Sequence, residues 1–345
     1  MSLTQLIVLS NLILGTIITG SSHHWLTAWI GLELNTLSIL AIMMQPKHHR
    51  TTEASIKYFL IQTIASATMV FSGTINAMQT GQWDISQLTN NHASTMFLLA
   101  AMMKIGAAPT HFWLPEVMQG TTMKTALIIA TWQKIAPITL LFSTHNLISN
   151  KITVIIGVLS ALIGGWGGMN QTQLQKILAY SSIANLGWTM VIFSTFPHTA
   201  ALNITIYMLM LIPTFLMMDK MTLKTLRDTT TTWTTSSTAS SMLTLLLLSL
   251  SGLPPLTGFL PKLLILNKLV TQNMTPVAST MAMLSLLSLF FYLRTTYTTT
   301  MTTPPTTTQT TMKWRLLPHH QKLTPPLILF SLISTPMLPA LAAMT

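Results

Sequence analysis

The chain has 345 residues, of which only 7% are charged and 50% are hydrophobic. A soluble domain carries about 25% charged residues, so a soluble chain of this size could not cover its surface, and we expect lipid to be its main solvent. The 17 Lys and Arg outnumber the 6 Asp and Glu and give a net charge of +11. These cations stand singly rather than in runs that contact phosphates, which argues against a nucleic-acid partner.

Other classes of site are excluded by what the sequence lacks. A chain with no cysteine has no disulfide, no thiolate nucleophile and no cysteine-ligated iron–sulfur cluster. The glycine-rich segment 164–168 lacks the strand and the lysine of a phosphate-binding loop, so close helix packing is the better interpretation. We predict no metal ligands and no cofactor-binding residues on this chain.

Apolar runs long enough to cross a membrane recur along the chain. A span needs about 20 apolar residues, and a helix satisfies its own backbone in hydrocarbon. We therefore predict an all-α polytopic membrane protein with about eleven transmembrane helices. In chain order, these are 2–21, 24–44, 54–78, 94–116, 122–144, 152–168, 174–195, 200–219, 241–269, 276–294 and 325–343. The start of the chain carries no basic presequence, so the first run is expected to remain as a span.

The placement of the cations supports this span count. If the loops alternate between the two sides, one side carries Lys47, Arg50, Lys57, Lys124, Lys176, Lys220, Lys224, Arg227, Arg294, Lys313, Arg315 and Lys322. The opposite side carries only Lys151 and Lys268. Because cytoplasm-like loops are enriched in Lys and Arg, the N-terminus is predicted on the cytoplasm-like side, which is the matrix side in a mitochondrion.

Three lysines and one carboxylate fall inside the apolar runs. Lys104, Lys134 and Lys262 are placed there, and Glu33 lies in the middle of the second predicted helix. A charge at the centre of a membrane helix costs at least about 2.5–3.5 kcal/mol, so such residues are most often functional. These residues are candidates for a proton relay. Structural intramembrane pairs, or side chains that reach the interface, are the alternative.

Two of the predicted helices share a pattern of helix-breaking residues. Each span contains five residues at the same relative spacing. In span 94–116 they are Gly106, Pro109, Leu114, Pro115 and Glu116, and in span 241–269 they are Gly252, Pro255, Leu260, Pro261 and Lys262. Each span should be a broken helix, and the two breaks lie five spans apart, which suggests inverted halves at 1–144 and 152–294. Segment 295–324 is Thr/Pro-rich and is expected to be a surface loop before the final helix 325–343.

His111 stands between the prolines of the first break. Its imidazole titrates near neutral pH, so it is a candidate to pass protons between Lys104 and Lys134. A structural histidine with its hydrogen bonds satisfied is the alternative.

Several segments carry a family resemblance that extends over nearly the whole chain. They are 24–26, 31–35, 52–60, 104–106, 111–116, 131–134, 170–174, 179–183 and 252–259. In these segments the chain resembles the antiporter-like membrane-arm subunits of mitochondrial NADH:ubiquinone oxidoreductase, respiratory complex I.

The resemblance implies an antiporter-like, proton-pumping subunit of the inner mitochondrial membrane, in the animal form that lacks the first helices of its relatives. The family's relay would be Glu33, Lys104, Lys134 and Lys262, which the placement of charges selects independently. It further implies that flavin, iron–sulfur clusters and the NADH site lie on other subunits. The partners would be other membrane-arm subunits, neighbouring antiporter-like ones among them, and membrane lipids.

Three functions therefore fit the sequence. The first is a pump subunit whose buried Glu/Lys relay is coupled to quinone reduction elsewhere in the complex. The second is a stand-alone cation/proton antiporter. The third is a scaffold of the membrane arm with no proton path of its own.

Overall fold

The computed structural model describes residues 3–254, 256–302 and 324–333, which are almost entirely helical. A helix lies in each of the predicted spans, and this confirms the all-α polytopic fold class. Six helical stretches among the described residues are long and apolar enough by themselves to cross a membrane. The chain forms two compact units, one of Met1–Ser160 with Phe193–Pro197 and the other of Ala161–Ile192 with His198–Thr345. That the predicted halves are related by inversion stays a prediction.

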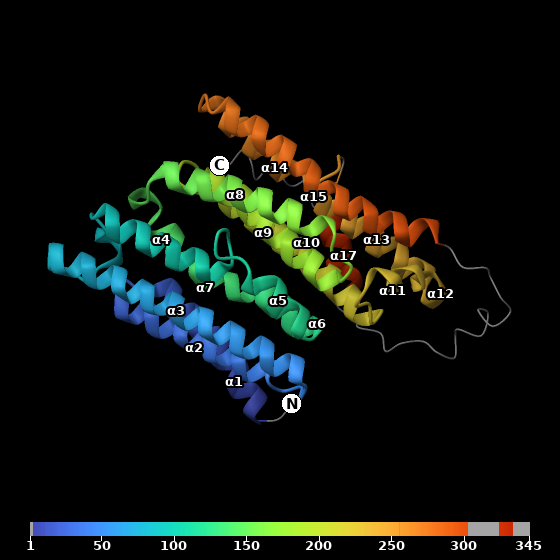
Figure 1. Cartoon of the computed structure of the whole chain (residues 1–345), viewed down its shortest axis with the longest axis horizontal. Helices are drawn as coiled ribbons and strands as arrows, with labels where there is room; N and C mark the ends of the chain where they lie inside the picture. The colour runs from blue at the N-terminus through green and yellow to red at the C-terminus, as the bar shows by residue number, and fades with distance from the viewer. Residues whose placement is uncertain (1–2, 255, 303–323, 334–345) are drawn as a thin grey trace. The chain divides into compact units, whose positions relative to one another are not determined.

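The first unit is a bundle in which α2 and α3 contact most of the other helices. Its helices are α1 (Leu3–Ser21), α2 (Trp25–Met43), α3 (His49–Thr80), α4 (Asn91–Ile105), α5 (Trp113–Gly120), α6 (Met123–Ala130), α7 (Trp132–Ser143), the 3₁₀ helices Ile85–Gln87 and His145–Leu147, and the start of α8 (Asn150–Met169). Helix α2 packs on α1, α3, α6 and α7, and α3 also packs on α4 and α5 (Figure 1).

The second unit is built around α15. Its helices are the end of α8, then α9 (Leu174–Phe193), α10 (Pro197–Lys220), α11 (Leu226–Thr230), α12 (Thr232–Thr235), α13 (Ser237–Ser251), α14 (Phe259–Thr271), α15 (Thr275–Met301) and α17 (Thr324–Ile333). Helix α15 packs on α11, α13 and α14, and α13 also packs on α17.

Both predicted helix breaks are present. Helix α4 ends before Gly106, which has φ 81°, and α13 ends before Gly252, which has φ 84°. This left-handed conformation is open to glycine at no steric cost, so the two glycines end the first half of each broken helix. Pro255, which belongs to the second predicted pattern, lies outside the described residues.

The later prolines of the two patterns have a different role from the one expected. Pro115 and Pro261 are each the third residue of the second half-helix, α5 and α14. The first N–H groups of a helix have no partner within the helix, so a proline there removes no hydrogen bond. These prolines therefore start the second half-helices rather than break a helix.

The span predicted as one helix over 122–144 is interrupted at Thr131, between α6 and α7. Pro137 lies inside α7, so it offers no N–H to the carbonyl of Gln133, and its ring crowds that carbonyl. The interruption lies just before this strained turn. A proline six residues after the break is the sequence signal that the prediction of an unbroken helix overlooked.

The predicted loop over 295–324 begins later than expected, because α15 continues to Met301. Thr295 and Thr299 are buried there, and each hydroxyl donates to the carbonyl three residues earlier in the helix. Helical threonines satisfy their own hydroxyl groups in this way, so a Thr-rich composition did not end the helix. Residues 303–323 of the predicted loop and 334–343 of the final predicted helix lie outside the described residues.

Glycines allow close helix packing in both units. A Cβ at Gly31 of α2 would lie 2.7 Å from the Thr19 Cγ2 atom of α1. In the second unit, a Cβ at Gly164 of α8 would lie 2.5 Å from the backbone nitrogen of Ala184 on α9. The second contact agrees with the packing interpretation of segment 164–168.

Candidate functional site

Glu33 lies on α2 and is half-buried in the first unit. The hydroxyl of Thr36, one turn later, lies 3.2 Å from the Glu33 Oε2 atom and donates to it. Helix α1 covers this part of α2, because Gly15 and Gly31 let the two backbones approach closely. The carboxylate therefore sits on a helix that is tightly held on one side.

Lys104 lies in the last turn of α4, immediately before the first helix break. It is 6% exposed, and among the described residues its Nζ atom has no hydrogen-bond partner. The Lys104 ammonium interacts electrostatically with the Glu33 carboxylate. The carbonyl end of α4 carries partial negative charge, which also favours a cation at this position. The predicted acid and the first predicted lysine thus lie within electrostatic reach of each other, but among the described residues they form no direct ion pair.

The backbone around Lys104 is held by two neutral side chains. The Gln62 Nε2 atom on α3 donates to the Lys104 carbonyl at 3.3 Å. The Trp113 indole at the start of α5 donates to the Met103 carbonyl at 3.0 Å, across the break. Carbonyls released by the end of a helix need such partners when they are buried.

Lys134 lies in the first turn of α7, directly after the interruption at Thr131, and is 3% exposed. Helix α7 packs on α1, α2 and α4, so Lys134 belongs to the same bundle as Glu33 and Lys104. The predicted relay between these three residues stays a prediction.

His111 lies in the first break and is 3% exposed. Its Nδ1 atom lies 3.2 Å from the Pro109 carbonyl, and its ring lies 4.2 Å from the Phe112 ring. These are local contacts that hold the turn together, as a structural histidine would. A role in passing protons between Lys104 and Lys134 stays a prediction.

Lys262 belongs to the second unit and lies in the first turn of α14. It is 8% exposed, and its Nζ atom donates to the Ser251 carbonyl at 2.8 Å. That carbonyl is at the end of α13, so the amine bridges the second helix break. Lys262 therefore finds its partner in a backbone carbonyl rather than in a carboxylate.

A small polar cavity opens beside Lys262. Its lining includes Ser181 and Asn185 of α9 and Ser288 and Tyr292 of α15. About 10 Å³ is open to the centre of a water molecule, which is close to the least that one water needs. The cavity thus offers Lys262 hydroxyl and amide neighbours in an otherwise apolar unit.

Four neutral polar residues that the charge pattern did not indicate also lie in the first unit with the buried charges. They are Asn35, Tyr58, Gln62 and Gln133, which are buried or half-buried in the first unit. Each stands inside an apolar run, and that is the sequence signal by which they could have been found.

Lys57 forms two ion pairs. Its Nζ atom lies 2.6 Å from the Glu53 Oε1 atom and 2.8 Å from the Glu116 Oε2 atom. The pair with Glu116 joins α3 to α5, the second half of the first broken helix. All three side chains are partly exposed, so this cluster is separate from the buried charges.

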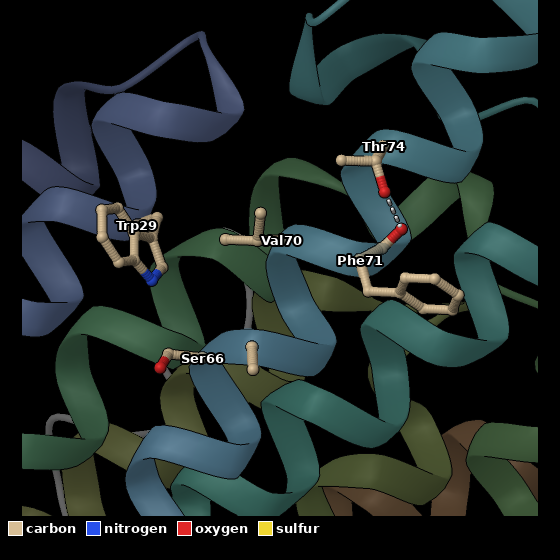
Figure 2. Close-up of a pocket in the computed structure, with 6 residues that line it drawn as sticks. Trp29, Ser66, Val70, Phe71 and Thr74 are labelled. Atoms are coloured by element: carbon tan, nitrogen blue, oxygen red, sulfur yellow. Dashed lines mark hydrogen bonds between the residues drawn. The ribbon is translucent and has the colours of Figure 1, made fainter.

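The open hollow drawn in Figure 2 is not the site of these charges. It is lined by Trp29 of α2 and by Ser66, Ala67, Val70, Phe71 and Thr74 of α3, and its volume is about 430 Å³. The Ser66 and Thr74 hydroxyls donate to carbonyls of their own helix. The hollow is therefore apolar and includes none of the predicted site residues.

Comparison with known proteins places the chain in a family. Residues 22–288 match the family model described as NADH:quinone oxidoreductase/Mrp antiporter, TM, and residues 289–345 match the one described as NADH dehydrogenase subunit 2 C-terminus. The chain is 53% identical over 336 residues to NADH-ubiquinone oxidoreductase chain 2 of Varanus timorensis, with 97% of each chain covered. It is 50% identical over 339 residues to that of Varanus melinus, with 98% of each covered.

The chain belongs to the NADH-ubiquinone oxidoreductase chain 2 family. As a member of this family, it is a multi-pass membrane subunit of the proton-translocating NADH:ubiquinone oxidoreductase. Its fold is similar to a chain of respiratory complex I from Thermus thermophilus, with a TM-score of 0.79 at 22% identity. That match covers 97% of this chain and 79% of the other. The antiporter-like fold is thereby confirmed.

Proposed function

We propose that this subunit moves protons through a buried relay of Glu33, Lys104, Lys134 and Lys262, driven by quinone reduction elsewhere in the enzyme. The observation that carries the proposal is Lys104, a buried amine with no hydrogen-bond partner among the described residues but in electrostatic interaction with Glu33. The protonated form of this amine is stabilised by the Glu33 carboxylate and by the carbonyl end of α4. A change in the charge of Glu33 would therefore change whether Lys104 holds its proton.

The magnitudes would allow Glu33 and Lys104 to act as a switch if their charges came into direct contact during turnover. Two unit charges 4 Å apart interact by about 4 kcal/mol at an effective dielectric constant of 20. Moving one charge against 100 mV takes about 2.3 kcal/mol. Making or breaking one buried ion pair is thus comparable with one step of charge movement across the membrane.

The remaining residues would receive the proton in turn. Lys134 would exchange its proton with Lys104, directly or through His111. Lys262 would act as the separate proton site of the second unit, where the Ser251 carbonyl and the small polar cavity are its neighbours. Hydroxyl and amide groups around a cavity of this kind can bind a water that carries a proton onward.

The location and partners follow from the same proposal. The Lys and Arg asymmetry supports an N-terminus on the matrix side of the inner mitochondrial membrane and a C-terminus on the intermembrane-space side. Other membrane-arm subunits, antiporter-like ones among them, and membrane lipids would surround the chain. Flavin and iron–sulfur clusters would lie on other subunits, because this chain has no cysteine for cluster ligation.

The relay is tested by removing its ionisable groups in the assembled enzyme. We expect Glu33→Gln and Lys134→Met each to lower coupled NADH:quinone turnover at least about tenfold, since a lost charge interaction of a few kcal/mol exceeds the 1.36 kcal/mol that a factor of ten represents. Protons pumped per NADH are measured in proteoliposomes. Lys151→Met is the matched control, because Lys151 is exposed at the start of α8. Full turnover and full pumping in both relay variants would refute the proposal.

A stand-alone cation/proton antiporter is the second candidate, because the matching family model is described for Mrp antiporters as well. This function predicts that the purified chain exchanges ions in vesicles without NADH or quinone. The scaffold alternative predicts that Lys104→Met reduces assembly while every assembled enzyme still pumps normally.

A further inference from the structure

A chain of neutral side chains crosses the first unit beside the buried charges. The Tyr58 hydroxyl on α3 donates to the Gln133 Oε1 atom on α7 at 3.4 Å. The Gln133 Nε2 atom donates in turn to the Asn35 Oδ1 atom on α2 at 3.0 Å. Tyr58 and Asn35 are each 1% exposed, so these bonds lie inside the bundle. One glutamine thereby joins three helices that are far apart in sequence.

Two members of this chain are close in sequence to the ionisable residues of the proposed relay. Asn35, at one end, is two residues after Glu33 on α2, and Gln133, in the middle, directly precedes Lys134 on α7. Tyr58 interacts electrostatically with Glu33. Its ring packs edge-on against Trp113, with ring centres 5.7 Å apart. Because Trp113 holds the backbone next to Lys104, Tyr58 also connects to the end of α4.

Gln133 occupies a weak point of the backbone. It lies between the interruption at Thr131 and Pro137, which cannot donate to the Gln133 carbonyl. The helix lacks this one hydrogen bond, so it can bend here, and Lys134 would move with it. The two side-chain bonds of Gln133 supply the restraint that the helix lacks.

The chemistry of an amide excludes a role for Gln133 as a proton carrier. A proton carrier accepts and donates at one atom, as water and hydroxyl groups do. A primary amide accepts at its oxygen and donates at its nitrogen, so no proton passes through it without an unfavourable tautomer. Gln133 therefore acts on the geometry of its neighbours.

We propose that Gln133 is a positioning residue that fixes Lys134 relative to Glu33 and Lys104 by bonding to Asn35 and Tyr58. This inference rests on the proposed relay and adds to it a residue that never holds the proton. The titratable groups of this bundle whose geometry it sets are Glu33 on α2, Tyr58 on α3, Lys104 on α4 and Lys134 on α7.

The test is Gln133→Leu in the assembled enzyme, which keeps the side-chain volume and removes both bonds. We expect turnover per assembled complex to fall about threefold to tenfold, as the loss of one or two hydrogen bonds worth about 1 kcal/mol each would give. We also expect the pH profile of turnover to move by about half a unit, because Lys134 no longer keeps one fixed environment. Thr139→Ala is the matched control, since within the described part of the chain the Thr139 hydroxyl bonds only to the Ala136 carbonyl of its own helix.

A second variant keeps the test decisive if Gln133→Leu assembles poorly. Tyr58→Phe removes one hydroxyl and leaves the ring against Trp113. It should shift the pH profile in the same direction, and combining it with Gln133→Leu should add no further shift, because the shared bond is already lost.

The outcomes separate this inference from the relay itself. If Gln133→Leu and Tyr58→Phe keep the wild-type pH profile and turnover per complex while Lys134→Met stops pumping, the positioning role is wrong and the relay stands. If Lys134→Met also pumps fully, the relay is wrong.

Discussion

Lys104 and Lys262 each place an amine at a helix break, but the two residues lie on opposite sides of their breaks. Lys104 is in the last turn of the first half-helix, whereas Lys262 is in the first turn of the second half-helix and reaches back to Ser251. In both units the amine is at the carbonyl end of a half-helix, where partial negative charge stabilises a cation. Helix ends thus contribute to holding both charges within an apolar bundle.

The position of the Lys262 amine can be tested by a single substitution at Gly252. A Cβ at Gly252 would lie 2.9 Å from the Lys262 Nζ atom, so Gly252→Ala should displace the amine from the Ser251 carbonyl. We expect turnover per assembled complex to fall at least about tenfold, the effect of losing a hydrogen bond to a charged group of about 1.5–3 kcal/mol. Turnover is normalised to the amount of assembled enzyme.

Gly81→Ala is the control for backbone strain. Gly81 has φ 73°, close to the 84° of Gly252, but a Cβ there would meet nothing within 4 Å. This variant should therefore lose about 1 kcal/mol of stability through strain and keep normal turnover. Equal losses of turnover in the two variants would contradict the role given to the Lys262 contact.

At the scale of elements, the contact between α1 and α2 holds the helix that carries Glu33. A Cβ at Gly31 would lie 2.9 Å from the Thr19 backbone nitrogen and 3.0 Å from the Gly15 carbonyl oxygen. Backbone atoms cannot rotate away as a side chain can, so the two helices must move apart to accept even one methyl group. The position of Glu33 relative to α4 depends on this spacing.

Gly31→Ala should therefore destabilise the subunit by about 1–3 kcal/mol, the usual cost of overpacking. Assembly of the enzyme on native gels and its thermal stability measure the effect. Gly20→Ala on α1 is the control, because a Cβ there has no neighbour within 4 Å. A wild-type melting temperature for Gly31→Ala would show that the close contact is absent in the assembled enzyme.

A second element is the pair of loops that precede α9 and α11 in the second unit. The Leu174 amide donates to the Lys224 carbonyl, and the Leu226 amide donates to the Thr172 carbonyl. Asp228 fixes the second loop by accepting from the Lys224 and Thr225 amides at 2.9 and 2.8 Å. Partial burial works against ionisation, but these hydrogen bonds outweigh it and hold the pKa of the Asp228 carboxyl below its ordinary value.

For the whole molecule, sidedness is the property that the sequence predicts most directly. Helix α3 has 32 residues, so at 1.5 Å per residue it is about 48 Å long, more than the ~30 Å of a hydrocarbon core. Its two ends should therefore lie on opposite sides of the membrane. Residues just inside its start and just beyond its end, Thr52 and Gln82, are exposed and can be replaced for labelling.

The chain has no cysteine, so a single introduced thiol is a unique label within it. In mitoplasts, we expect a membrane-impermeant maleimide to label Gln82→Cys from the intermembrane-space side. Thr52→Cys should be labelled only after the membrane is opened, because it is predicted on the matrix side. The unmodified chain is the control. The reverse pattern, or labelling of both variants from one side, would contradict the predicted topology.

Charge was the sequence signal that selected the candidate site residues, and glycine was the signal that predicted the helix breaks. A single lysine in an apolar run indicates a functional residue, because its charge is energetically costly inside a membrane. The repeated pattern around Gly106 and Gly252 predicted both helix breaks. Gln133 and Asn35 were not selected as candidate site residues, because a neutral amide costs less than a charge in a membrane helix and is common between packed helices. The interruption at Thr131 was not predicted because the nearest proline, Pro137, stands six residues later in the chain.

The two interrupted helices are joined by side chains with different acid–base behaviour. Across the first, the Trp113 indole donates to the Met103 carbonyl, and an indole keeps its hydrogen throughout the physiological pH range. Across the second, the donor is the Lys262 amine, whose hold on the Ser251 carbonyl weakens when it becomes neutral. The hydrogen bond across the first break therefore does not depend on the protonation of its donor, whereas the bond across the second break would weaken if Lys262 gave up its proton. A change of backbone geometry that follows directly from deprotonation of the bridging donor is thus expected at the second break alone.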